Sequence, residues 1–193
     1  MIGAVGGIIG TFFSYSVEFV TGLRAEHSWL LYLLPAGGLL TVVIYKLSKL
    51  QGISTNRVLE SVRTETNVPS VLAPVIFACT VITHLFGGSA GRECAALQIG
   101  GSIASLFSQL FKSDERTRHT LVQCGMSALF SALFGTPLVA AVFTLEVITI
   151  GRIRLIAAIP CAVSSAIAYA ISQGLSVTAE RFRYDTVPAF FRL

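Results

Sequence analysis

The strongest constraint on this chain is a glycine-rich break between two apolar segments, at residues 86–105, with the sequence FGGSAGRECAALQIGGSIAS. Three glycines precede Glu93, and an apolar helix of small residues is expected to begin at Cys94. Inside a bilayer, irregular backbone is tolerated only where it is buried in protein or lines a water-filled cavity. A carboxylate at the same depth is a functional candidate by default. The break therefore predicts an ion path.

The composition is typical of a protein that is embedded in a lipid bilayer. Of the 193 residues, 53% are hydrophobic and 12% are charged, whereas a soluble domain carries about 25% charged residues. The net charge of +4 comes from Lys and Arg in the loops, without a basic stripe interleaved with aromatics, which argues against a nucleic-acid surface. The four cysteines have no metal-ligand spacing, so neither a metal nor a cofactor is expected.

Seven apolar segments follow one another, and we predict an all-α integral membrane protein of spanning and half-spanning helices, some of them broken. Pro35 is expected to kink the second segment. Short hydrophobic segments interrupted by Gly or Pro are typical of a transporter binding site. In the last segment, Ala158, Ala162 and Ala166 are expected to form a small-residue packing face. The segments cover residues 1–23, 28–45, 71–86, 94–111, 119–134, 138–150 and 155–173.

The orientation in the cell membrane follows from the distribution of positive charge. The longest polar connection, residues 46–70, contains Lys46, Lys49, Arg57 and Arg63. Loops rich in Lys and Arg stay on the cytoplasmic side. We therefore predict a multi-pass protein whose N-terminus and 46–70 loop are both cytoplasmic.

The expected helix start after the break suits a permeating anion. The first N–H groups of a helix have no intrahelical partners and carry partial positive charge, and a glycine-rich approach lets an ion come close to them. When it is ionised, the Glu93 carboxylate can occupy the anion site itself and block the path. When it is protonated, it can swing out, which would couple gating or exchange to pH. In the structural alternative, Glu93 pairs with Arg92 or lies in a loop exposed to water. Arg92 is expected to have a structural role, as a hydrogen-bond partner of carbonyl groups near the break.

At these residues the sequence resembles the CLC family of voltage-gated chloride channels and anion/proton antiporters. Residues 91–102, GRECAALQIGGS, match the family's GREGP-xxQ-x-GG region. Residues 114–121, 134–138 and 143–146 match later motifs in the same register. The resemblance implies one half of an inverted-repeat fold, so that 1–193 is a partial transmembrane domain, the N-terminal half.

The resemblance also implies roles for individual residues. Glu93 is then the gating, proton-linked glutamate, and main-chain N–H groups at the start of its helix hold the anion. Ser54 stands in the place of the family's ion-coordinating serine, with Thr55 next to it if the register shifts. The implied anion-binding residues are Ser54, Gly91, Arg92, Cys94 and Ala95. The residues that could support them from the surrounding layer are Thr55, Asn56 and Glu146.

The chain departs from the family pattern at several of these positions. Cys94 and Ala95 replace a Gly and a Pro of the motif. Val147 replaces the acid that accepts protons on the inner side of chloride/proton exchangers, which argues against that proton route. Asn56 and the absence of a nearby Pro bring the segment closer to the fluoride-exporting branch.

We therefore expect transmembrane anion transport of the voltage-gated chloride channel type, with chloride as the ion and Glu93 guarding the path. The alternative is a fluoride/proton antiporter of the same family, and a different class is a non-transporting scaffold or truncated remnant. An enzyme is not expected, because no nucleophile motif accompanies Glu93. The expected partners are chloride or fluoride, protons, the lipid bilayer and, at full length, a second copy in a homodimer. Because the family's second half is absent, the chain is expected to be a fragment or to assemble with another chain.

Overall fold

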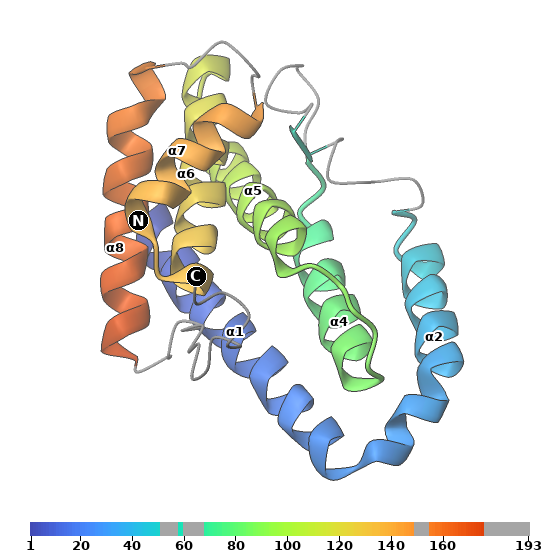
Figure 1. Ribbon diagram of the computed structural model, residues 1–193. Coiled ribbons are helices and arrows are strands. Elements are labelled where there is room, and N and C mark those ends of the chain that lie inside the picture. The colour runs from blue at the N-terminus through green and yellow to red at the C-terminus, as the bar shows by residue number, and fades with distance from the viewer. Residues whose placement is uncertain (51–57, 60–67, 149–154, 176–193) are drawn as a thin grey trace, which may run out of the picture.

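The computed structural model describes residues 1–50, 58–59, 68–148 and 155–175, and these residues form seven α-helices (Figure 1). Successive helices run in opposite directions along one bundle, as the ribbon shows. The all-α prediction is confirmed. The helices are α1 (Ile2–Glu26), α2 (Leu34–Leu47), α4 (Leu72–Leu85), α5 (Arg92–Leu110), α6 (Glu115–Phe134), α7 (Pro137–Ile148) and α8 (Ala158–Gly174), with short 3-10 turns η1 (Ser28–Leu33) and η2 (Leu155–Ala157).

Two of the described stretches, Ile2–Glu26 and Ser28–Leu47, are long and apolar enough to cross a bilayer. Two shorter apolar helices, α4 and α7, have 14 and 12 residues, and about 20 are needed to span the hydrocarbon core. The kink predicted at Pro35 is wrong in detail. Pro35 lies in the first turn of α2, after η1, where its missing N–H would have had no partner in any case.

Helix α1 packs closely between α6 and α8 because glycines cover both contact faces. A methyl group built on Gly6 would lie 2.7 Å from Ala128 Cβ, and one on Gly10 would lie 2.7 Å from Ala132 Cβ. Gly7 lies in the same way against Ala168 of α8. In lipid, where apolar burial gives little drive for association, small residues let helix backbones approach and gain dispersion energy.

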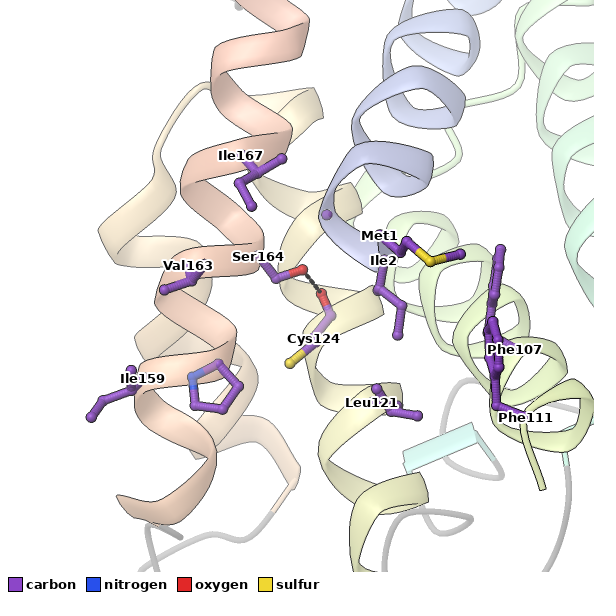
Figure 2. Close-up of a pocket in the computed structure, with 12 residues that line it drawn as sticks. Met1, Ile2, Phe107, Phe111, Leu121, Cys124, Ile159, Val163, Ser164 and Ile167 are labelled. Carbon is purple, nitrogen blue, oxygen red and sulfur yellow. Dashed lines mark hydrogen bonds between the residues drawn. The ribbon is translucent and has the colours of Figure 1, made fainter. Parts of the chain in front are cut away.

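Serine side chains fasten α6 to α8. Each hydroxyl donates to a main-chain carbonyl of the facing helix, which satisfies the hydroxyl in a bundle without water. Figure 2 includes one of these bonds, between Ser164 and Cys124. The bonds are Ser127 Oγ to Cys161 O at 3.3 Å, Ser131 Oγ to Ser165 O at 2.9 Å, Ser164 Oγ to Cys124 O at 3.1 Å and Ser172 Oγ to Ala132 O at 3.0 Å.

These bonds identify the packing face of α8, and it differs from the predicted one. Cys161, Ser165 and Ala168 are fully buried. Of the predicted residues, Ala158 and Ala162 are partly buried and pack against a cluster that includes residues of α7, whereas Ala166 is exposed. Since Ser can both pack closely and donate to a carbonyl, it replaces Ala at the contact.

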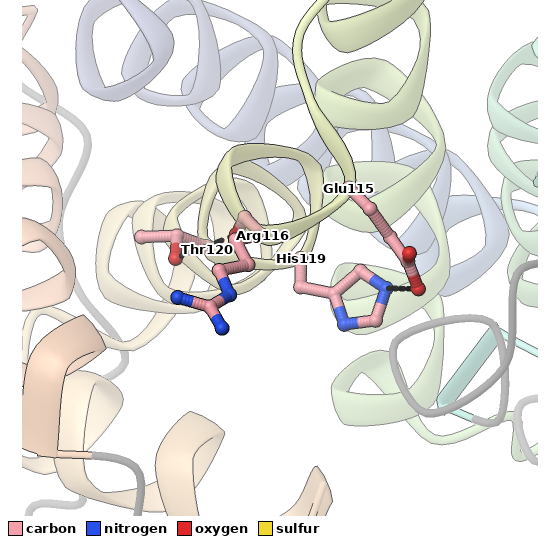
Figure 3. A network of polar contacts seen from close by, with 4 residues as sticks. All are labelled: Glu115, Arg116, His119 and Thr120. Carbon is pink, nitrogen blue, oxygen red and sulfur yellow. Dashed lines mark hydrogen bonds and ion pairs between the residues drawn. The ribbon is translucent and has the colours of Figure 1, made fainter.

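Helix α6 begins at Glu115, earlier than the predicted residue 119, so part of the charged linker is helical. Its first turns carry a local polar network (Figure 3). His119 Nε2 lies 3.7 Å from Glu115 Oε1, and the Thr120 hydroxyl donates to the Arg116 carbonyl at 3.1 Å. Asp114 precedes the helix, and hydrogen bonding to Thr117 lowers the pKa of its carboxyl. A carboxylate there also meets the positive end of the helix dipole.

Candidate functional site

The glycine-rich break begins with a glycine in the left-handed conformation. Gly87 has φ +86° and ends α4. Its N–H donates to His84 O at 3.1 Å, and the Gly88 N–H donates to Thr83 O at 2.8 Å. This is the Schellman pattern, which satisfies carbonyls that the end of a helix leaves free. The first glycine is therefore required by the turn itself.

The end of α1, the turn η1 and the start of α2 hold the break in place. Leu31 lies against Gly87, and the Phe86 ring lies against Gly37 of α2. The Arg24 side chain also reaches Gly87, since a methyl group there would lie 3.6 Å from Nη1. Neither Arg24 nor Leu31 is among the site residues predicted from the sequence. No local motif marks them, because they meet the break only after folding.

Helix α5 begins two residues earlier than predicted, at Arg92, so Glu93 belongs to its first turn. Gly91 precedes the helix in an extended conformation, with φ −65° and ψ 134°. A methyl group on Gly91 would lie 2.9 Å from Glu93 Oε2, so the carboxylate folds back over the start of its own helix. It is exposed there, beside the N–H groups that such a helix start leaves without intrahelical partners.

The other residues predicted around Glu93 lie together because they are consecutive in the chain. Cys94 is exposed, Arg92 is partly buried, and Ala95 is 5% exposed. Glycine at position 91 leaves open the side from which an ion would approach the main chain. The start of α5 thus brings together a carboxylate and the main-chain N–H groups that a helix start leaves without partners.

Of the remaining predicted residues, the structure describes only Glu146. Ser54, Thr55 and Asn56 lie outside the described residues. Glu146 is exposed in the last turn of α7, and Val147 beside it is partly buried. A second break lies between the predicted segments 119–134 and 138–150, with Gly135 at φ 66° and Pro137 as the first residue of α7.

A cavity of about 420 Å³ lies elsewhere, between α1, α5, α6 and α8 (Figure 2). Its lining is mostly apolar and does not include Glu93. Cys124 and Cys161 meet near it with their sulfur atoms 3.9 Å apart. Within the described ranges, no group of three His, Cys, Asp or Glu side chains is placed to hold a metal ion.

Comparison with known proteins identifies the family. The model of the family described as voltage gated chloride channel matches residues 36–191. The chain belongs to this family. It is accordingly a membrane protein, and membership confirms the prediction that it is not an enzyme.

Individual relatives show where in the family the similarity lies. A chloride/fluoride channel protein of Pseudomonas syringae is 34% identical over 179 residues, which cover 92% of this chain and 40% of the relative. The H(+)/Cl(-) exchange transporter ClcA of Vibrio campbellii is 26% identical over 162 residues, 76% of this chain and 35% of the relative.

Two solved structures have the same fold. The crystal structure of a CLC-type fluoride/proton antiporter matches with a TM-score of 0.86 and 32% identity, over 97% of this chain and 49% of that one. A slow cyanobacterial Cl⁻/H⁺ antiporter matches with a TM-score of 0.75 and 17% identity, over 92% and 45%. The chain therefore spans about half the length of the relatives it matches.

Proposed function

We propose that the chain is one half of a CLC-type transmembrane domain and takes part in proton-linked fluoride transport, with Glu93 as the gate. The observation that carries the proposal is the position of Glu93 in the first turn of α5. Its carboxylate lies over the helix start, with an oxygen 2.9 Å from the position of a Gly91 methyl group. An ionised carboxylate there competes with an incoming anion for the same N–H groups, and protonation removes the competitor.

Fluoride has more support than the chloride expected from the sequence. The relatives that are more than 30% identical are a chloride/fluoride channel protein and a fluoride/proton antiporter, whereas the chloride exchanger ClcA is 26% identical. Asn56 and the absence of a nearby Pro point in the same direction. Val147 also removes the inner acid on which chloride/proton exchange would depend, so chloride is the second candidate ion.

Anion efflux from proteoliposomes tests this function. The chain is purified in the assembly that it forms in its membrane, and fluoride and chloride efflux are compared between pH 5 and pH 8. We expect fluoride to leave faster than chloride, at a rate that depends on pH, because the proposal links the path to protons through Glu93. In Glu93→Gln, which cannot ionise, the rate should change less than about twofold.

Glu26→Gln is the matched control, because it removes another exposed carboxylate without touching α5. It should keep the pH dependence of the wild type. Equal pH dependence in the wild type and Glu93→Gln would contradict the gating role. Absence of anion efflux from folded protein would contradict transport and favour a scaffold or remnant.

The assembly is proposed to be a homodimer formed through α7 and α8. Leu138 is 76% exposed, and Ile156 and Ile159 are 89% and 76% exposed. Apolar side chains on one face of a bundle are suited to packing against another protein surface or lipid. Cross-linking of Ile159→Cys between copies in membranes, in a Cys94→Ser background, tests this, since a lipid-facing position would give no dimer band.

A further inference from the structure

We propose that Arg24 steers anions to the start of α5, as a fixed positive charge at the outer end of the break. The inference rests on the proposed function, because it concerns the approach to the Glu93 site. Arg24 lies in the last turn of α1, far from Glu93 in the sequence. Its guanidinium reaches the turn at Gly87, from which the chain continues directly to the start of α5.

The guanidinium has no compensating acid among the described residues. Arg24 is partly buried and forms no hydrogen bond or ion pair within the described structure. The electrostatic field of a partly desolvated cation is not neutralised when no carboxylate pairs with it, so the cation attracts a mobile anion. The same charge paired with an acid would have little effect on a passing anion.

The acidic residues of α1 face another direction. Glu18 and Glu26 line a cavity of about 270 Å³ together with Tyr15 and Gly22, and Arg24 is not part of its lining. Positions 24 and 26 are about 200° apart around a helix. The last turn of α1 thus separates its charges, with the cation toward the break and the carboxylates away from it.

Among the described residues, Arg24 touches the turn at Gly87, while Arg92 and Glu93 begin α5. Of these three residues, Arg24 lies at the far end of the segment that leads to α5, because it touches the turn at Gly87 where that segment begins. An anion arriving from that end meets Arg24 before it meets Glu93. Glycines at 87, 88 and 91 keep this segment free of bulky side chains.

Cys94 makes the proposal testable without any transport measurement. It is exposed beside Glu93, whereas Cys79, Cys124 and Cys161 are buried. Anionic sulfonatoethyl and cationic trimethylammonioethyl methanethiosulfonates modify an accessible thiol, and the ratio of their rates reports the local electrostatic potential. The purified chain is treated with each reagent at about 10 mM salt, where the Debye length is about 30 Å.

In Arg24→Gln we expect the ratio of anionic to cationic modification rates to fall about threefold or more. Arg24→Lys should keep the ratio of the wild type, and about 1 M salt should abolish the difference, because charges are then screened beyond about 3 Å. Arg116→Gln makes the same change in net charge on an exposed residue of α6 and should leave the ratio unchanged.

Three results would overturn the steering role. One is an unchanged ratio in Arg24→Gln, which would leave Arg24 as a cap on the carbonyls that end α1. Another is an equal fall in Arg116→Gln, which would indicate a general charge effect. A third is an unreactive Cys94 in the wild type, since the helix start would then be closed to ions. Failure of fluoride efflux with a normal charge ratio would instead contradict the transport proposal alone.

Discussion

At position 87 a side chain would meet both a backbone and a packing obstacle. The left-handed conformation costs an L-residue about 1–2 kcal/mol, and a methyl group would overlap Leu31. We expect Gly87→Ala to lower the free energy of unfolding by about 2 kcal/mol, measured by thermal unfolding in a fixed detergent. Gly38→Ala is the control, because Gly38 lies in a helix with nothing within 4 Å; it should gain about 0.5–1 kcal/mol. Equal effects of the two changes would show that the break does not need its glycine.

At the same scale, the sequence predicted the helix start at Glu93 better than the residues that surround it. A glycine run followed by Glu93 is a local pattern, and the helix start that it predicts is present two residues earlier. The contact of Arg24 with Gly87 joins positions far apart in the chain, so no spacing rule could predict it. The expected packing stripe is present only in part, since Ala158 and Ala162 pack against a buried cluster while Ala166 is exposed, and the reason is related. Which small residues face a neighbour depends on the rotation of α8 against α6.

At the scale of one element, the charged cap of α6 predicts a pH dependence of stability. Hydrogen bonding to Thr117 holds the pKa of Asp114 below its ordinary value of 3.8. The ionised carboxylate therefore stabilises the folded protein above that pH, and this contribution is lost as the pH falls through the lowered pKa. We expect the melting temperature of Asp114→Asn to depend less on pH than that of the wild type between pH 5 and pH 2, about the range in which a carboxyl titrates.

Thr117→Ala should flatten the same curve, because it removes the main partner of the carboxylate. Thr120→Ala removes a hydroxyl that donates instead to the Arg116 carbonyl, and the pH dependence should remain. If all three variants follow the wild type, the cap contributes nothing to acid stability.

Helix α1 depends on glycine where it crosses α6. A methyl group on Gly10 would lie 2.7 Å from Ala132 Cβ and 3.4 Å from the Leu129 carbonyl oxygen. Neither atom can move without its helix, so we expect Gly10→Ala to destabilise the bundle by about 1–3 kcal/mol. Gly22→Ala, on the same helix with nothing within 4 Å, should be neutral or stabilising. Thermal unfolding compares the stability of the two variants. An equal loss of stability in both would mean that helix propensity, and not packing, determines the effect of replacing glycine.

At the scale of the whole molecule, the seven helices of the described residues were predictable because long apolar runs and Gly or Pro breaks are local features of the sequence. The orientation across the membrane depends instead on where the bundle gathers its charges. The helix ends around Lys46, Lys49 and Lys112, with the start of α6, lie toward one end of the bundle (Figure 1). The ends of α1 and α4 meet at the opposite end, near Arg24.

This separation predicts that the end with Lys46 and Lys112 is cytoplasmic. In a Cys94→Ser background, a membrane-impermeant maleimide added to intact cells should label Tyr32→Cys and spare Thr117→Cys, since both positions are exposed but lie at opposite ends. Permeabilised cells, in which both should react, control for reactivity. The reverse pattern would place Arg24 on the cytoplasmic side, and anions steered by it would then enter the path from within the cell.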